Sequence, residues 1–329
     1  MIQKTYFLLF LLISTISFGQ ITIEDNETKE PVPFATISFG NGNGIFADED
    51  GKFVFTKKRY SDIDTLTISS VGYKGLKITT ENLPLKLLLE PKTDLLEEVI
   101  VQVKPKGKFK LRKIKPVLHD DYFKCWLPTI ESEIAVYFPN DEKRTKQITK
   151  LFLPIKAEAS DWSKRKKANS KKRSFSTLFK VKFYENNNGF PGEILSYEKV
   201  VFRVTQESEA VFELDISKND IFIPKKGIFV SIQVLGYTNK EGKLLPNKKY
   251  QEVKTRKGIV KVSTTFRPLL PFTEKIVEKR TFTKRIFLDD NDWIKFEKKN
   301  VPNNKLLLSG LNNYGMGMEM KVYQEKNNL

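Results

Sequence analysis

The sequence predicts an all-β protein built from two tandem β-sandwiches. Most of its hydrophobic runs are short, rich in β-branched and aromatic residues, and alternate with polar side chains. Turn residues such as Gly, Asn, Asp and Pro close these runs, and no segment shows a convincing helical stripe. A chain of 329 residues with 40% hydrophobic residues and 25 phenylalanines is long enough for two packed cores, which excludes wholesale disorder.

Residues 1–19 have the pattern of a secretory signal peptide. Lys4 precedes an apolar run that begins at Phe7, and small residues lie where a signal peptidase would cut. The segment is too short to favour a spanning helix, although an uncleaved N-terminal anchor is the alternative. No cysteine follows the apolar run, so we do not expect a lipoprotein anchor. We expect a mature chain from Gln20 that is exported through the Sec pathway and has no transmembrane segment.

Residues 20–103 predict the first sandwich. The run Ala35–Phe39 alternates apolar and small polar side chains, as a strand with one buried face does. A Gly/Asn-rich loop follows at 40–44, and Asp48–Gly51 predicts a hairpin turn before the strand Lys52–Phe55. The acidic turn also resembles a calcium loop in residue type, but it lacks the EF-hand spacing, so we interpret it as a hairpin.

Three segments of this region resemble one known family. The segments Pro31–Ile37, Ala47–Phe53 and Leu66–Tyr73, in this order and spacing, are similar to the carboxypeptidase regulatory-like domain. That transthyretin-like sandwich also occurs at the N-terminus of many TonB-dependent outer-membrane receptors, and Leu96–Val101 resembles the segment that leads from it into the receptor plug. The residues that follow are too few for a receptor barrel. The resemblance implies a β-sandwich and an envelope setting, and it implies no catalytic residue.

Residues 104–129 predict a basic linker. The segment 104–115 alternates cations with a Pro and a Gly, which is typical of a solvated joint, although Phe109 and Leu111 equally suit the start of a strand. A second basic run lies at 163–173. The functional interpretation of both runs is contact with an anionic surface, such as lipid, glycan or an acidic protein. The candidate contact residues are Lys104, Lys106, Lys108, Lys110, Arg112, Lys113, Lys164, Arg165, Lys166, Lys167, Lys171, Lys172 and Arg173.

Residues 130–329 predict the second sandwich, which we expect to be jelly-roll-like. Within it, 179–183 alternates strictly, with apolar residues on one side and lysines on the other. Met316, Met318 and Met320 alternate in the same way, which indicates a last strand with one buried face rather than a Cu(I) site. The segments Phe179–Tyr184, Phe190–Leu195, Asp215–Ile216 and Ile223–Val230 also make about 132–235 similar, less specifically, to a companion domain that often follows the regulatory-like module in secreted bacterial proteins.

Little in the sequence indicates catalysis. His119 is the only histidine, which disfavours most hydrolytic metal sites, and we interpret it as an ordinary exposed residue rather than a metal half-site with the carboxylates beside it. The single cysteine, Cys125, excludes an intrachain disulfide and is interpreted as a buried structural thiol. No nucleophile elbow or phosphate-binding loop is present. A close pair among Asp215, Glu213 and Glu193 would be needed to revive a glycosidase.

The sequence therefore predicts a non-catalytic envelope protein, periplasmic, bound to the outer membrane or secreted, that acts as an adaptor or binding module without a cofactor. The formal charge of +17 is compatible with nucleic acid, but no nucleic-acid-binding fold accompanies it and export disfavours that partner. The alternative is a carbohydrate-binding module in which the second sandwich recognises a polysaccharide. Its aromatic platform would be drawn from Trp126, Trp162, Trp293, Tyr184 and Tyr237.

Overall fold

The computed structural model describes residues 19–40, 42–92, 105, 107–142, 144–164, 170–196, 198–246, 251–256, 258–262, 264–288 and 292–324. These residues are nearly all in strands, turns and loops, which confirms the predicted all-β class. The expected signal peptide lies outside the described residues except for Gly19. Among the described residues, no helix has both the length and the apolar character needed to cross a membrane.

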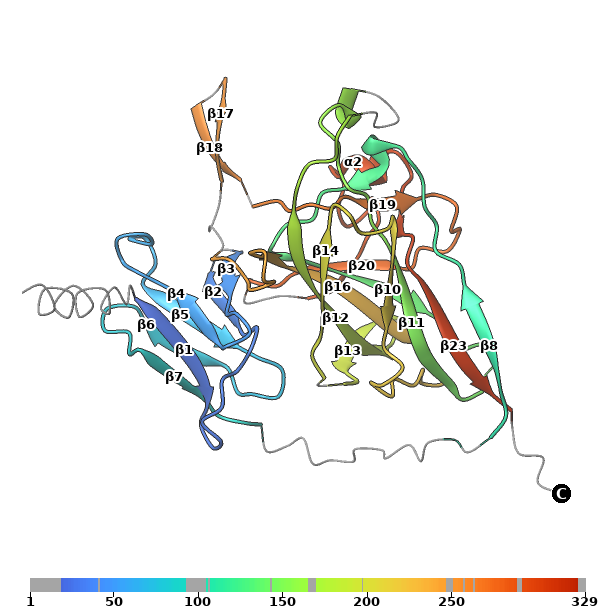
Figure 1. Ribbon diagram of the computed structural model, residues 1–329, viewed down its shortest axis with the longest axis horizontal. Coiled ribbons are helices and arrows are strands. Elements are labelled where there is room, and N and C mark those ends of the chain that lie inside the picture. The colour runs from blue at the N-terminus through green and yellow to red at the C-terminus, as the bar shows by residue number, and fades with distance from the viewer. Residues whose placement is uncertain are drawn as a thin grey trace, which may run out of the picture. The chain divides into compact units, whose positions relative to one another are not determined.

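The chain divides into two compact units, and each is described by itself. The first contains the residues up to Ile37 together with Phe46–Lys92, and the second contains Ser38–Ile45 and the residues from Thr93 on. Two sheets, with strand orders β4-β1-β7 and β3-β2-β5-β6, account for the N-terminal strands (Figure 1). Their bounds are β1 (Gln20–Asp25), β2 (Thr36–Gly40), β3 (Asn43–Phe46), β4 (Lys52–Val54), β5 (Thr65–Ser69), β6 (Leu76–Thr79) and β7 (Lys86–Leu89).

The acidic turn before β4 is held by its own carboxylate. Asp48 Oδ1 accepts the backbone N–H groups of Asp50 at 3.0 Å and of Lys52 at 2.7 Å. Gly51 closes the turn at a φ of +69°, and a Cβ there would lie 2.6 Å from the carbonyl oxygen of Ile23. The carboxylate thus satisfies backbone donors, as the hairpin interpretation requires.

Two larger sheets form the second unit. One has the order β13-β12-β16-β10-β20-β21, with β14 also paired to β12, and the other has the order β15-β11-β23-β8. The first consists of β10 (Ser132–Phe138), β12 (Ser176–Asn187), β13 (Phe190–Ile194), β14 (Val200–Thr205), β16 (Ile228–Tyr237), β20 (Thr281–Arg285) and β21 (Ile294–Lys295). The second consists of β8 (Phe109–Ile114), β11 (Lys146–Pro154), β15 (Val211–Asp215) and β23 (Gly317–Tyr323).

Apolar faces of these two sheets pack against each other. Phe179 on β12 stacks on Phe202 of β14, and Phe202 stacks on Phe212 of β15 in the other sheet with ring centroids 4.9 Å apart. Met318 and Met320 on β23 are buried on the same side, which confirms the predicted last strand. The second unit is therefore a sandwich with a continuous apolar core.

Shorter elements complete the described part of the second unit. A small sheet of order β22-β19-β9 combines segments far apart in the sequence, and a separate hairpin is formed by β17 and β18. Their bounds are β9 (Cys125–Trp126), β17 (Gln251–Thr255), β18 (Gly258–Val262), β19 (Leu270–Thr273), β22 (Asn313–Tyr314), the 3-10 helices η2 (Tyr122–Lys124) and η3 (Trp162–Lys164), and the single-turn helix α2 (Lys305–Leu308).

The structure corrects the linker prediction for part of 104–129. Residues 109–114 are strand β8, which pairs antiparallel with β23 from Phe109↔Tyr323 to Ile114↔Met318. The strand alternative for Phe109 and Leu111 is therefore the right one. The cations of this segment suggested a solvated linker. Lysine and arginine are also common on edge strands such as β8, whose backbone is paired on one side.

Candidate binding surface

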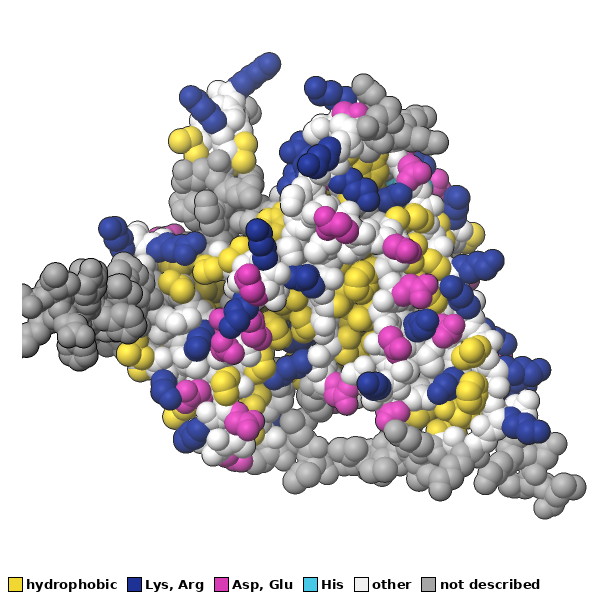
Figure 2. All heavy atoms as spheres, in the orientation of Figure 1, with side chains coloured by type: hydrophobic (Ala, Val, Ile, Leu, Met, Phe, Trp, Pro, Cys, Tyr) yellow, Lys and Arg dark blue, Asp and Glu magenta, His cyan; other side chains and the backbone are white. Residues whose placement is uncertain are grey.

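Among the described residues, strand β8 is the edge strand of the sheet β15-β11-β23-β8, next to β23 (Figure 1). Five of its six residues are exposed, and two of these are large and hydrophobic, with Phe109 46% and Leu111 61% exposed. Lys110 lies between these two hydrophobic residues, and Arg112 and Lys113 follow Leu111. Figure 2 shows hydrophobic side chains bordered by cations in the area of β23 and β8. This mixture of bare apolar and basic groups differs from an edge that is only protected by charge.

Contacts along β8 orient its side chains in two directions. Lys113 Nζ lies 3.9 Å from the ring centroid of Phe152, and Arg112 forms an ion pair with Glu142. Phe109 packs edge-on against Tyr323, and Lys321 Nζ lies 5.0 Å from the Phe109 ring. On the face that carries Phe109, aromatic rings and cations therefore adjoin, whereas Arg112 lies on the opposite face.

The backbone of β8 has one edge without a partner strand among the described residues. The carbonyl of Lys108 accepts the N–H of Gln324 at 3.0 Å, which places the peptide groups of that residue toward β23. Because peptide groups along a strand alternate sides, those of Phe109, Leu111 and Lys113 point away from β23. An open row of donors and acceptors therefore runs along the same edge as the cations.

The second basic run is anchored differently. Lys164 ends η3, while Lys172 Nζ donates to the carbonyl of Gln206 at 3.3 Å. The Arg173 side chain lies 3.7 Å from Glu158, which also accepts a 2.6 Å bond from Arg267. These described cations belong to loop structure around Glu158, on different elements from β8. Lys104, Lys106, Arg165, Lys166 and Lys167 lie outside the described residues, whereas Lys108, Lys110, Arg112, Lys113, Lys164, Lys171, Lys172 and Arg173 lie within them.

A buried charged network lies on the lysine face of β12. Glu133 of β10 is fully buried, and Lys182 Nζ donates to its Oε2 at 2.9 Å. Tyr184 and Ser231 donate their hydroxyls to Oε1 at 2.7 and 2.6 Å. Burial raises the pKa of the Glu133 carboxyl, but Lys182, Lys284 and the two hydroxyls outweigh it and lower that pKa to about 2. Sequence alternation identified the lysine face of β12. It did not predict that this face is buried, because the carboxylate that makes burial of the lysines possible lies on another strand, β10.

The same face brings more cations together than one carboxylate can balance. Across the sheet, Lys180 lies opposite Gln233, Gln233 opposite Glu133, and Glu133 opposite Lys284. Burial, reinforced by repulsion from Lys182, lowers the pKa of Lys180 to about 7. Lys284 Nζ lies 4.9 Å from the Trp293 ring, a cation–π contact that adds to its attraction to Glu133.

The proposed aromatic platform is not assembled in the structure. Trp162 and Tyr184 are buried, and Trp293 packs edge-on against Tyr184. Trp126 packs against Phe272, and Tyr237 against Phe266. Only Tyr184 and Trp293 pack against each other, and Tyr184 is buried, so the structure does not assemble these five aromatics into one exposed platform and the interpretation is wrong for this set. Sequence could not separate core from surface aromatics because both occur at alternating strand positions.

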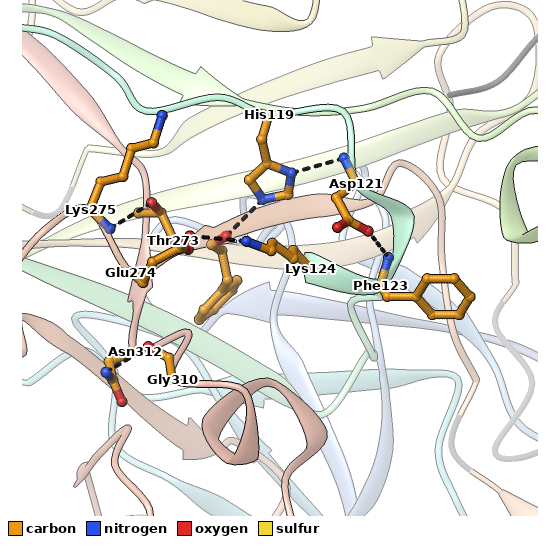
Figure 3. A network of polar contacts seen from close by, with 10 residues as sticks. His119, Asp121, Phe123, Lys124, Thr273, Glu274, Lys275, Gly310 and Asn312 are labelled. Atoms are coloured by element: carbon orange, nitrogen blue, oxygen red, sulfur yellow. Dashed lines mark hydrogen bonds and ion pairs between the residues drawn. The ribbon is translucent and has the colours of Figure 1, made fainter. Parts of the chain in front are cut away.

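His119 is bound by backbone groups (Figure 3). Its Nδ1 accepts the N–H of Asp121 at 3.2 Å, so Nε2 carries the proton and donates to the carbonyl of Phe272 at 2.7 Å. Asp121 itself accepts the N–H of Phe123 at 3.0 Å and caps η2. Nε2 thus joins the segment before η2 to β19, while Nδ1 holds the turn within that segment, so both ring nitrogens have structural partners. Among the described residues, no group of His, Cys, Asp and Glu side chains is arranged to hold a metal ion.

Cys125 is a shielded thiol. Its Sγ donates to the carbonyl of Asp121 at 3.3 Å, and burial raises its pKa to about 12. The thiolate is the reactive form, so this environment suppresses reaction.

We expect Cys125 in the folded protein to react with iodoacetamide at pH 8 at least about tenfold more slowly than in denaturant. Mass spectrometry of the alkylated fraction against time measures the rate, and the denatured chain is the control. Equal rates would contradict a shielded thiol.

Two of the three carboxylates considered for a glycosidase, Glu213 and Asp215, have local partners. Glu213 forms a 3.5 Å ion pair with Lys150, and Asp215 accepts the N–H of Ser217 at 2.8 Å. Hydrogen bonds from Ser217 lower the pKa of Asp215, which keeps it ionised. Both groups thereby have a role in holding β15 and the turn that follows it.

The N-terminal strands and their acidic turn correspond to a known family. Residues 18–101 match the family model described as the CarboxypepD_reg-like domain. This part of the chain is a CarboxypepD_reg-like domain. The match confirms the resemblance inferred from the sequence, and it ends before β8. In this CarboxypepD_reg-like domain the acidic turn acts as the hairpin described above.

The comparisons give little for the second unit. No curated protein matches the chain. The chain is 12% identical to the cysteine protease and lectin-like domains of Cwp84, a surface layer associated protein of Clostridium difficile, with 58% of this chain and 32% of that chain covered and a TM-score of 0.30. A clostridial Cwp84 structure after propeptide cleavage gives 10% identity, 92% and 70% coverage and a TM-score of 0.32. Likeness at this level defines neither fold nor function.

Proposed function

We propose that the protein is a non-catalytic adaptor or binding module of the bacterial envelope, located at the outer membrane, that holds an anionic partner. The observation that carries the proposal is β8, where exposed apolar and basic side chains share the open edge of a rigid sandwich. Such an edge attracts anionic groups over a distance set by the salt concentration and then buries apolar surface on contact. The CarboxypepD_reg-like domain and the signal-peptide pattern of residues 1–19 support the envelope setting.

A carbohydrate-binding function is the second candidate. On the face of the β23–β8 pair, the rings of Phe109 and Tyr323 lie 5.8 Å apart, and Tyr323 donates its hydroxyl to Gln147 at 2.8 Å. Adjacent aromatic rings can stack on the apolar face of a sugar, while the buried Gln147, which also donates to Asp220 at 2.9 Å, holds the Tyr323 ring in place. This pair differs from the aromatics that the sequence suggested, and it was missed because Phe109 and Tyr323 are far apart in the chain.

Binding across a salt series tests the two candidates. We expect the chain from Gln20 to bind outer-membrane fractions with an affinity that falls at least about tenfold between low and high salt. A variant with Lys110→Gln and Arg112→Gln should lose most of this binding. The matched variant with Lys171→Gln and Lys172→Gln, which removes the same charge from the other run, should retain it.

Controls with defined probes separate the interpretations. The same series is run on anionic phosphatidylglycerol vesicles, an acidic polysaccharide and a neutral polysaccharide. If the chain binds the neutral polysaccharide independently of salt and Phe109→Ala abolishes this binding, the result would support carbohydrate binding instead of the adaptor function. Equal loss in both charge variants would contradict a role specific to β8.

A further inference from the structure

The open edge of β8 offers more than a charged patch. The peptide groups of Phe109, Leu111 and Lys113 face away from β23, as the bond from Gln324 to Lys108 establishes. Unpaired peptide groups in a row are a template for one more strand. A lipid or glycan surface has no matching array of alternating donors and acceptors, whereas an extended polypeptide has.

The side chains of β8 define what such a strand must carry. Lys110 and Arg112 project on one face of the sheet, and Phe109 and Leu111 project on the other, because side chains alternate along a strand. A strand paired to this edge would set its own residues directly opposite these. Acidic residues on one face and apolar residues on the other would complement both.

From these observations we propose that β8 receives an acidic, alternating β-strand from a partner protein as a fifth strand of the sheet β15-β11-β23-β8. The inference rests on the proposed function and names its partner class. Backbone hydrogen bonds supply the pairing, and Lys110 and Arg112 select carboxylates on the incoming strand.

A second copy of the chain fits the edge poorly. Self-pairing of β8 in antiparallel register sets the cations Lys110, Arg112 and Lys113 against one another or against apolar side chains. Like charges directly opposite each other destabilise a strand pair. The basic character that attracts an acidic strand therefore also discourages homodimers through this edge.

The test uses a labelled peptide in which glutamate and valine alternate, with fluorescence anisotropy as the readout. We expect the full chain to bind this peptide and not the version with lysine in place of glutamate. Leu111→Pro removes one outward N–H at an edge position where proline is tolerated, and it should weaken binding at least about tenfold. The matched control Leu111→Thr keeps the N–H and the strand propensity, so it should change the affinity by less than about threefold. Lys110→Glu should weaken binding through repulsion.

Several outcomes would overturn the inference. Thermal unfolding followed by circular dichroism shows whether Leu111→Pro is folded; if it is not, a peptide N-methylated at alternate residues takes its place on the unaltered chain. Unchanged affinity for the methylated peptide, or for a folded Leu111→Pro variant, would exclude strand addition. Dimerisation in sedimentation that is lost on Leu111→Pro would assign the edge to a second copy. Residues 96–101 (LEEVIV) of the same chain carry two carboxylates, Glu97 and Glu98. A tenfold gain in peptide affinity in the Glu97→Lys, Glu98→Lys variant would assign the β8 edge to that segment.

Failure of this inference is distinct from failure of the proposed function. One result would separate them. If binding to outer-membrane fractions is salt-sensitive and needs Lys110 and Arg112 but persists in Leu111→Pro, the proposed function stands and the added strand is excluded. The same pattern on phosphatidylglycerol vesicles would identify a lipid surface instead.

Discussion

Replacing Glu133 with alanine is expected to destabilise the second unit by about 3–5 kcal/mol. The carboxylate is fully buried and accepts bonds from Lys182, Tyr184 and Ser231. Its removal leaves Lys182 with no compensating charge in a side-chain environment that is 15% exposed. Breaking a buried pair by removing one partner costs more than the pair contributed, because the remaining charge is desolvated and unpaired.

Chemical denaturation monitored by tryptophan fluorescence measures this effect. Glu213→Ala is the matched control, since its ion pair with Lys150 is exposed and such pairs contribute little. Equal losses of stability in the two variants would contradict a special role for the buried network.

The same carboxylate predicts how stability depends on pH. The folded-state pKa of Glu133 is about 2, below its ordinary value of 4.5. The unfolded chain therefore binds the proton more readily, so the contribution is fully present above about pH 4.5 and is lost as pH falls toward 2. Glu133→Gln should flatten this part of the stability profile, and an unchanged profile would argue against the assigned pKa.

Replacing Asn313 with leucine is expected to cost about 3 kcal/mol. The amide is fully buried and donates to the carbonyls of Ile276 at 3.0 Å and Glu278 at 3.1 Å. Its oxygen accepts the N–H of Arg280 at 2.7 Å. Leucine has similar bulk but no polar atoms, so these buried backbone groups would lose their partners.

The neighbouring Asn312→Ala variant is the control, because its amide donates to the carbonyl of Gly310 at 2.9 Å in an exposed hydrogen bond. Thermal unfolding of both variants measures the difference. A loss below about 1 kcal/mol for Asn313→Leu would show that water or rearranged backbone replaces the amide.

The sequence was informative where structure depends on near neighbours. The hairpin at Asp48–Lys52 follows from a short polar side chain and a glycine within one turn. The strand segments 179–183 and 317–320 follow from period-two alternation, which any window of five residues contains. The family of residues 18–101 was recognisable for the same reason, since its motifs are short and ordered along the chain.

The sequence predicted the cations of the candidate surface but not the strand pairing that places them. Lys110 and Arg112 were identified as cations in contact with an anionic partner, which stays a prediction. Their place on a paired strand depends on β23, more than 200 residues later in the chain. Periodicity allowed Phe109 and Leu111 to belong either to a solvated linker or to the start of a strand. The choice between these two interpretations needs the partner strand, which the local sequence does not contain.

By itself, the sequence determined the all-β class, the CarboxypepD_reg-like domain and the positions of most turns, because alternation and turn chemistry are local properties of the chain. Only the tertiary structure decided which strand lies at an edge, which lysine face is buried and which aromatics are core. Those properties depend on pairing and packing between distant segments: Glu133 neutralises lysines on other strands, and β8 is open because no described strand lies beyond it.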